Sequence, residues 1–117
     1  LDDLISLGVT RVLTSGQRES AIKGAKTVKK MIEYASDCID ILPGGGINTQ
    51  NVGEFINETG THSVHASARS LRHDTSVCGN PEIFFGGKLN GVGIPENEYK
   101  VTDSALVQNV VAAIEAR

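Results

Sequence analysis

Small, polar and glycine residues follow three apolar segments of this chain, and these are the residues whose types and spacing could do chemistry. They form the runs Thr14-Ser15-Gly16, Pro43-Gly44-Gly45-Gly46 and His65-Ala66-Ser67-Ala68-Arg69. Glycines in a row carry no Cβ, so the backbone N–H groups of the second run can approach an anion closely. This run predicts a turn that binds a compact anion such as phosphate, although a tight turn with positive φ angles would use the same residues.

The third run ends a segment whose side chains should alternate between two faces. His65, Ser67 and Arg69 would share one face, and Val64, Ala66 and Ala68 the other. Arg69 can form a bidentate pair with a carboxylate or phosphate, and His65 can act as an acid, a base or a donor near neutral pH. We therefore regard both as candidate catalytic residues. A structural ion pair for Arg69 and a core histidine for His65 remain equally open.

Two hydroxyl groups follow the first apolar segment, on Thr14 and Ser15. Either could bind a ligand at a strand end, although capping of the following turn is the slightly favoured alternative. The sequence pairs no general base with Ser15, so nucleophilic catalysis has no support. The candidate anion-binding set is Thr14, Ser15, Gly44, Gly45, Gly46, Ser67 and Arg69.

Soft donors suitable for copper(I) are few in this chain. They are Cys38, Cys78 and the single methionine, Met31. Cys38 precedes the second apolar segment, at the end opposite the glycine run, and we expect it to be a buried apolar residue. Cys78 is a weak metal candidate that could reach His65 or His73, although no spacing enforces this. The residues themselves make no cofactor evident.

Buried parallel strands are predicted at residues 10–15, 39–42 and 63–68, because these short apolar runs are separated by segments long enough for a helix. The first intervening helix has an apolar stripe made of Ala21, Ala25, Val28, Ile32 and Ala35. The next helix should begin near Asn48 as N-cap and end at Gly60, which favours the left-handed conformation.

The C-terminal part of the chain combines an irregular stretch with a final helix. Residues 71–100 are rich in glycine and asparagine without periodicity, which indicates a loop or arm. Thr102 or Asp103 should cap the last helix. That helix presents an apolar face made of Leu106, Val107, Val110, Val111 and Ile114.

Parallel strands joined by helices form either an open doubly wound sheet or a closed barrel. We favour a (β/α)₈ barrel of the TIM type, which needs about 250 residues. The chain has 117 residues, begins within a helical pattern and lacks an initiator methionine, so it should be part of one barrel domain. Two strand edges are then unpaired. We expect missing N-terminal strands or another copy of the chain to cover them, and a homo-oligomer is therefore expected.

The composition and charge of the chain exclude some classes of binding partner. The chain is 39% hydrophobic and 21% charged with a net charge of −3, and no apolar run is long enough to cross a membrane. It offers no basic stripe for nucleic acid. A small anionic or polar ligand remains. With two cysteines and no secretory segment, we expect a reduced, cytoplasmic protein.

The ordered set of motifs resembles the CutC-type proteins, named for copper homeostasis. It comprises the run from Arg11 to Gly16, the glycine run with Asn51 after it, Gly60, and the run from His65 to Arg69. The resemblance implies a β/α barrel whose sixth to eighth strands are present here, and a role in copper homeostasis with copper(I) binding. The cysteines proposed as copper ligands in some members lie in early strands, so neither cysteine here inherits that role.

Two other functions stay open beside this one. The glycine run with His65 and Arg69 would suit an enzyme that acts on a phosphorylated or carboxylated metabolite. The unpaired edges would suit a non-catalytic fragment that functions only in an assembly. The sequence alone does not decide whether a reaction is catalysed.

Overall fold

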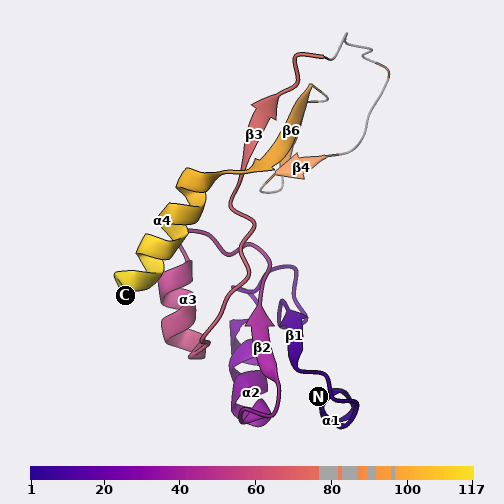
Figure 1. Ribbon diagram of the computed structural model, residues 1–117, viewed down its shortest axis with the longest axis vertical. Coiled ribbons are helices and arrows are strands. Elements are labelled where there is room, and N and C mark those ends of the chain that lie inside the picture. Colours follow the sequence, from indigo (N-terminus) through magenta and orange to yellow (C-terminus); the bar gives the residue numbers. More distant parts are fainter. Residues whose placement is uncertain (77–81, 83–86, 90–91, 96) are drawn as a thin grey trace.

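The chain folds into a small α/β body from which a two-stranded ribbon extends (Figure 1). The structure is a computed structural model that describes residues 1–76, 82, 87–89, 92–95 and 97–117. In chain order the elements are α1 (Asp2–Ser6), β1 (Arg11–Thr14), α2 (Ala25–Ala35), β2 (Asp40–Pro43), α3 (Val52–Thr59), β3 (Arg69–His73), β4 (Lys88–Leu89), β5 (Val92–Gly93), β6 (Glu98–Thr102) and α4 (Ser104–Glu115).

Strands β1 and β2 pair in parallel, as the sequence predicts, with Val12 beside Ile41 and Thr14 beside Pro43. These four residues turn toward the helices, and Ile41 and Pro43 are buried. The opposite face carries Arg11, Leu13, Asp40 and Leu42, and it has no covering helix (Figure 1). Leu13 is 60% exposed on this open face. The α/β class is therefore confirmed, with one face of the strand pair packed and one face bare.

The helices α2 and α3 bury most of the stripes that their spacing predicts, although α2 begins at Ala25, so that Ala21 is buried in the preceding turn, and Ile32 is only half-buried. Val28 and Val52 are fully buried, Phe55 is 2% exposed, and α2 packs on both α3 and β2. Helix α3 begins at Val52, later than the predicted start at Asn48. Asn48 instead caps the preceding turn, because its Oδ1 accepts a hydrogen bond from the N–H of Gln50. The predicted end is confirmed, since Gly60 takes the left-handed conformation.

The prediction of a third regular strand at residues 63–68 is wrong. This segment touches β2 through one parallel bridge, between Gly44 and His65, and forms no continuous ladder. Its predicted alternation nevertheless holds: His65 and Ser67 are exposed, and Val64 and Ala66 are half-buried against the core. A turn in which Thr61 Oγ1 bonds to Ser63 competes with the ladder at the start of the segment.

The stretch predicted to be irregular contains strands instead. β3 pairs with β6 in antiparallel register, from Arg69 beside Thr102 to His73 beside Glu98. β4 and β5 form a separate short hairpin. Apolar periodicity could not reveal the β3–β6 ribbon, because most of its side chains are exposed and charged or polar. A two-stranded ribbon of this kind buries little and depends on backbone hydrogen bonds.

Helix α4 leaves the ribbon and packs on α3. Asp103 is its N-cap, one of the two residues predicted, and its Oδ1 accepts from the N–H groups of Ala105 and Leu106. The predicted apolar face is only partly buried: Val110 is 8% exposed, but Val107 and Val111 are 41% and 47% exposed. The face is broader than the single neighbouring helix can cover. Among the described residues, no helix is long and apolar enough to cross a membrane.

Candidate functional site

Gly44, Gly45 and Gly46 form a turn directly after β2, which we call the glycine turn. Hydrogen bonds to the carbonyl groups of Gly45 and Gly46 hold this turn in place. Gly45 O accepts from the Ala21 N–H at 2.8 Å, and Gly46 O accepts from Asn51 Nδ2 at 2.9 Å. The Asn51 amide also accepts, through Oδ1, from the Asn48 N–H at 2.9 Å. Gly45 and Gly46 have φ angles of +107° and +75°, which favour glycine. Both residues are exposed, and their N–H groups make no hydrogen bond within the described part of the chain.

His65 lies against the first glycine of the turn. Its N–H donates to the carbonyl of Pro43 at 2.8 Å, which draws the segment onto β2. A Cβ added at Gly44 would lie 3.0 Å from His65 Cβ and 2.9 Å from Leu13 Cδ1. Gly44 is therefore needed for close approach of these two side chains. The exposed His65 side chain belongs to the open face that also carries Leu13.

Thr14 and Ser15 both bond to the turn after β1, which is the alternative that the sequence slightly favoured. Thr14 Oγ1 accepts from the Gly16 N–H at 3.0 Å, and Ser15 Oγ donates to the Arg18 carbonyl at 2.6 Å. Ser15 still borders the glycine turn, because a Cβ added at Gly45 would lie 3.6 Å from Ser15 Cβ. The two hydroxyl groups thus shape the wall of the turn and retain acceptor capacity.

A cleft of about 240 Å³ gathers part of the predicted anion-binding set. It lies between the glycine turn, the start of the ribbon and α4. Its lining residues are Gly46, Ile47, Asn48, Thr49, Gln50, Ser67, Ala68, Arg69, Leu89, Leu106 and Val110. Gly46, Ser67 and Arg69 are brought together here, whereas Thr14, Ser15, Gly44, Gly45 and His65 do not line it.

The two candidate catalytic residues are separated by a turn in the backbone. Ala68, between them, has a φ of +42°, an uncommon angle for a residue with a Cβ. After this turn Arg69 begins β3 and enters the cleft, while His65 stays beside Gly44. Arg69 is exposed and forms no ion pair within the described residues. Its guanidinium is therefore available to an anionic ligand.

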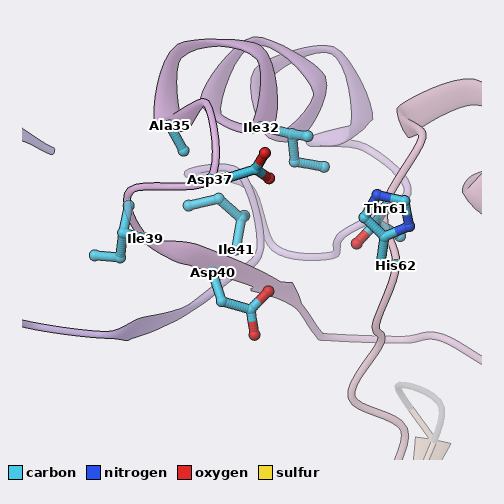
Figure 2. A pocket seen from close by; sticks show the side chains of 8 residues that line it. All are labelled: Ile32, Ala35, Asp37, Ile39, Asp40, Ile41, Thr61 and His62. Carbon is cyan, nitrogen blue, oxygen red and sulfur yellow. The ribbon is translucent and has the colours of Figure 1, made fainter.

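A second cavity, of about 150 Å³, lies at the opposite end of the strands (Figure 2). Buried Ala35, Ile39 and Ile41 form its apolar floor. Asp37 and His62 stand at its rim, with the Asp37 carboxylate turned toward the cavity. Sequence reasoning missed this cavity. The two aspartates that flank Ile39, at positions 37 and 40, were the available signal.

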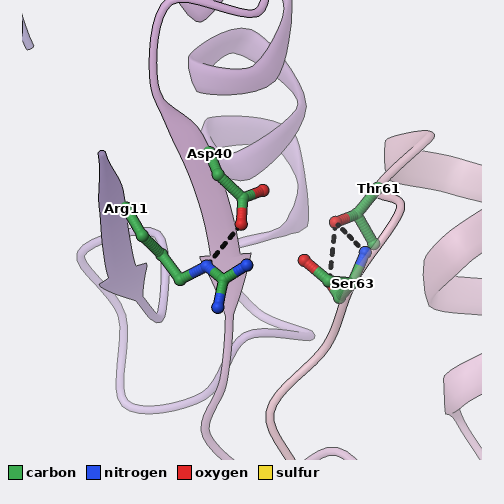
Figure 3. A network of polar contacts seen from close by, with 4 residues as sticks. All are labelled: Arg11, Asp40, Thr61 and Ser63. Carbon is green, nitrogen blue, oxygen red and sulfur yellow. Dashed lines mark hydrogen bonds and ion pairs between the residues drawn. The ribbon is translucent and has the colours of Figure 1, made fainter.

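Polar contacts cross the open face near the start of the strands (Figure 3). Arg11 Nε donates to Asp40 Oδ2 at 2.5 Å, and Thr61 Oγ1 donates to the Ser63 carbonyl at 2.8 Å. Ser63 Oγ is buried without a hydrogen-bond partner among the described residues. The Arg11–Asp40 pair thus joins β1 and β2 at their N-terminal ends, whereas the Thr61–Ser63 bonds are local to one turn.

The described residues do not fit a copper site. They contain no group of three or more His, Cys, Asp or Glu residues placed to hold a metal ion. Cys38 is an exposed free thiol, so its prediction as a buried residue is wrong; it follows the end of α2, where the chain turns outward before β2. Cys78, the weak metal candidate, lies outside the described residues.

Asp103, the N-cap of α4, accepts several hydrogen bonds near the cleft. Ser70 Oγ donates to Asp103 Oδ2 at 3.0 Å, in addition to the two backbone donors of the cap. These bonds lower the pKa of Asp103 below its ordinary value, and the bond from Ser70 has the largest effect. The Asp103 carboxylate is therefore engaged by Ser70 and its own helix, and Arg69 has no ion-pair partner among the described residues.

Known proteins resemble this chain along most of its length. A protein from Treponema denticola named as a family protein CutC is 48% identical over 89 residues, which are 76% of this chain and 36% of the relative. The human copper homeostasis protein cutC homolog is 37% identical over 112 residues, 96% of this chain and 40% of that protein. The chain thus spans well under half the length of these relatives.

A solved structure is similar as well. The crystal structure of a candidate copper homeostasis protein CutC from Streptococcus agalactiae superimposes with a TM-score of 0.51 at 38% identity, covering 55% of this chain and 31% of that one. The model of the CutC family matches residues 1–70, which include β1, β2, the glycine turn and the segment with His65. This match extends over more than half of the chain, and the chain therefore belongs to the CutC family.

Proposed function

We propose that this chain acts in copper homeostasis as the C-terminal part of a CutC-type β/α barrel, and that its glycine turn binds a compact anion. The observation that carries the proposal is that the N–H groups of Gly45 and Gly46, two exposed residues, make no hydrogen bond to the described residues, whereas their carbonyls are tied to the protein. Backbone donors at a strand end are a common way to hold a phosphate. The role in copper homeostasis is taken from the human relative that carries this name.

The barrel part of the proposal is supported by the two unlike faces of the strands. Helices cover the face with Val12 and Ile41, and the face with Leu13 is open, as in a wedge cut from a barrel. In this proposal β1, β2 and residues 63–68 are the sixth to eighth strands. The remaining strands, or a second copy of the chain, would cover Leu13. Sedimentation that finds a stable monomer of this chain alone would contradict the need for such a partner.

The anion site is tested with inorganic phosphate and acetate on the full chain. Ligand that binds only the folded state raises the free energy of unfolding by RT ln(1 + [L]/Kd), so the melting temperature should rise with concentration. Arg69→Ala should reduce this rise. Arg72→Ala is the matched control, because Arg72 is also exposed on β3 but does not line the cleft. Equal ligand-induced shifts in the two variants would refute the assignment of Arg69.

In this proposal the chain contributes to the control of copper levels without binding copper through its described residues, because these residues form no cluster of metal ligands. Direct copper(I) carriage would require a thiol such as Cys78. A titration of copper(I) against a competing chelator decides the question. Binding that is unchanged in a variant lacking both Cys38 and Cys78 would exclude thiolate-based carriage. We propose the cytoplasm as the location, where both thiols would stay reduced.

A second candidate function is catalysis on a phosphorylated or carboxylated metabolite. The observation that favours it is the close packing of His65 against Gly44, next to the proposed anion site. An exposed imidazole beside a bound anion can transfer protons near neutral pH. His65→Gln should then abolish turnover and leave phosphate binding unchanged. Loss of phosphate binding in the same variant would instead make His65 a binding residue.

A further inference from the structure

We propose that the cleft beside the glycine turn takes an amphipathic anion: a phosphate or carboxylate group on a short alkyl or acyl stem. This inference rests on the proposed anion site and adds the chemistry of the rest of the ligand. It follows from the unlike composition of the two ends of the cleft. The lining includes a cation and a hydroxyl group, on Arg69 and Ser67, together with aliphatic side chains, and we assign these two kinds of residue to two ends of the cleft.

The charged end contains Arg69 and Ser67. Both are exposed, and Arg69 has no ion-pair partner within the part of the chain that the structure describes. Asp103 lies on the neighbouring strand end but is occupied by Ser70 and by the first turn of α4. No carboxylate therefore neutralises Arg69 from this side. Gly46 also lines the cleft, and its N–H, which makes no hydrogen bond within the described residues, is a further backbone donor in this region.

The apolar end is formed by α4, by Leu89 of β4 and by the residue after the glycine turn. Ile47 is 5% exposed and Val110 is 8% exposed, while Leu106 and Leu89 are half-buried. Leu106 and Val110 are four residues apart, so they lie on one face of α4 and form a strip about 6 Å long. An inorganic ion alone would leave Leu106, the half-buried residue of this strip, in contact with water. A hydrocarbon stem would cover it.

The direction of the ligand follows from the register of the ribbon. Arg69 pairs with Thr102, directly before the N-cap of α4. Leu106 lies in the first turns of that helix, and Val110 lies one turn further on. The ligand head therefore belongs at Arg69 and the stem runs along α4. A volume of about 240 Å³ is below the roughly 300–1,000 Å³ of sites for drug-sized ligands, so the stem is short.

Calorimetric titration of the full chain with five probes tests this inference: inorganic phosphate, butyl phosphate, acetate, pentanoate and butanol. Each buried methylene should strengthen binding about fourfold. Butyl phosphate or pentanoate should therefore bind at least about tenfold more tightly than phosphate or acetate, respectively. Butanol should bind much more weakly, because it cannot pair with Arg69.

Two pairs of variants separate the ends of the cleft. Arg69→Ala should remove the preference for butyl phosphate over butanol, and Arg72→Ala should keep it. Leu106→Ser should remove the advantage of butyl phosphate over phosphate, whereas Val107→Ser, at an exposed position beside it, should keep that advantage. Circular dichroism establishes that each variant is folded. Should Leu106→Ser unfold, the five-probe comparison on the unchanged chain still decides the matter.

The outcomes distinguish this inference from the function on which it rests. Phosphate that binds as tightly as butyl phosphate, together with acetate that binds as tightly as pentanoate, would overturn the amphipathic ligand and leave the anion site standing. Butanol that binds as tightly as butyl phosphate would show an apolar groove and overturn the role of Arg69. If no anion binds, the proposed anion site itself fails.

Discussion

The Asn51 side chain connects the glycine turn to α3, and replacing it with alanine should loosen the turn. Asn51→Ala removes the bond from Nδ2 to Gly46 O and the bond from the Asn48 N–H to Oδ1, each 2.9 Å long. A typical protein hydrogen bond contributes about 0.5–1.5 kcal/mol, and Asn51 is half-buried. We therefore expect the free energy of unfolding to fall by about 1–2 kcal/mol. Phosphate affinity should fall with it, because the Gly46 carbonyl then keeps only the longer bond from Asn48 Nδ2, 3.3 Å, and the turn is held less firmly.

Urea unfolding followed by circular dichroism measures the change in stability, and calorimetry measures the phosphate affinity. Asn51→Asp keeps the acceptor for the Asn48 N–H and loses the donor to Gly46, so it should lose about 1 kcal/mol of stability. Its added negative charge should nevertheless weaken phosphate binding more than alanine does. Asn57→Ala, at an exposed position on α3, is the control. A stability of Asn51→Ala equal to that of this control would refute the role of Asn51.

Three further predictions concern the surrounding structure. Gly16→Ala should lower the free energy of unfolding by about 2–5 kcal/mol, because the φ of Gly16 is +69° and the new Cβ would lie 2.4 Å from a backbone oxygen. Gly60→Ala should lower it by only about 1–2 kcal/mol, because Gly60 has a similar φ of +71° but no atom within 4 Å of the new Cβ. Equal urea midpoints for the two variants would contradict this prediction. The pKa of Asp103 is lower in the folded than in the unfolded protein, so its carboxylate stabilises the fold above the unfolded pKa of about 3.9. This stabilisation is lost as the pH falls through the folded pKa. The urea midpoints of the wild type and Asp103→Ala should therefore converge below about pH 4. Arg11→Ala should change the free energy of unfolding by less than about 1 kcal/mol, because Arg11 and Asp40 are 62% and 39% exposed, and a larger loss would mean that this ion pair is better shielded than its exposure indicates.

Local pattern was enough to predict most of the body of the fold. The apolar runs marked β1 and β2 to within one residue at each end, and the stripe with Val28 marked α2. Backbone pairing was harder to predict. The segment with His65 keeps the side-chain alternation of a strand but forms only one bridge, because hydrogen bonding depends on neighbours that alternation does not reveal.

The sequence predicted which residues could form the candidate site, but it predicted only in part which of them lie together. Arg69 and Gly46 do meet in one cleft, whereas His65 does not reach it. His65 is instead bonded to the Pro43 carbonyl and packs on Gly44. The positive φ of Ala68 then directs the chain into β3, and alanine gives no sign of such a turn in a sequence. The β3–β6 pairing that carries Arg69 was also hidden, since its partners are far apart in the chain and its exposed side chains need no apolar pattern.

The central position of β2 has a consequence for how the body opens. Its N-terminal end is bonded to the Thr10 carbonyl, and its C-terminal end bonds through Gly44 to Thr14 and through Pro43 to His65. Chain segments from before and after β2 are thus both attached to it, while β1 and the His65 segment have one attached side each. Local fluctuations should release these outer segments before β2 itself. Solvent deuterium should then reach the amides of β2 last within the body, and the glycine turn would keep its shape through most of the transient openings of the molecule.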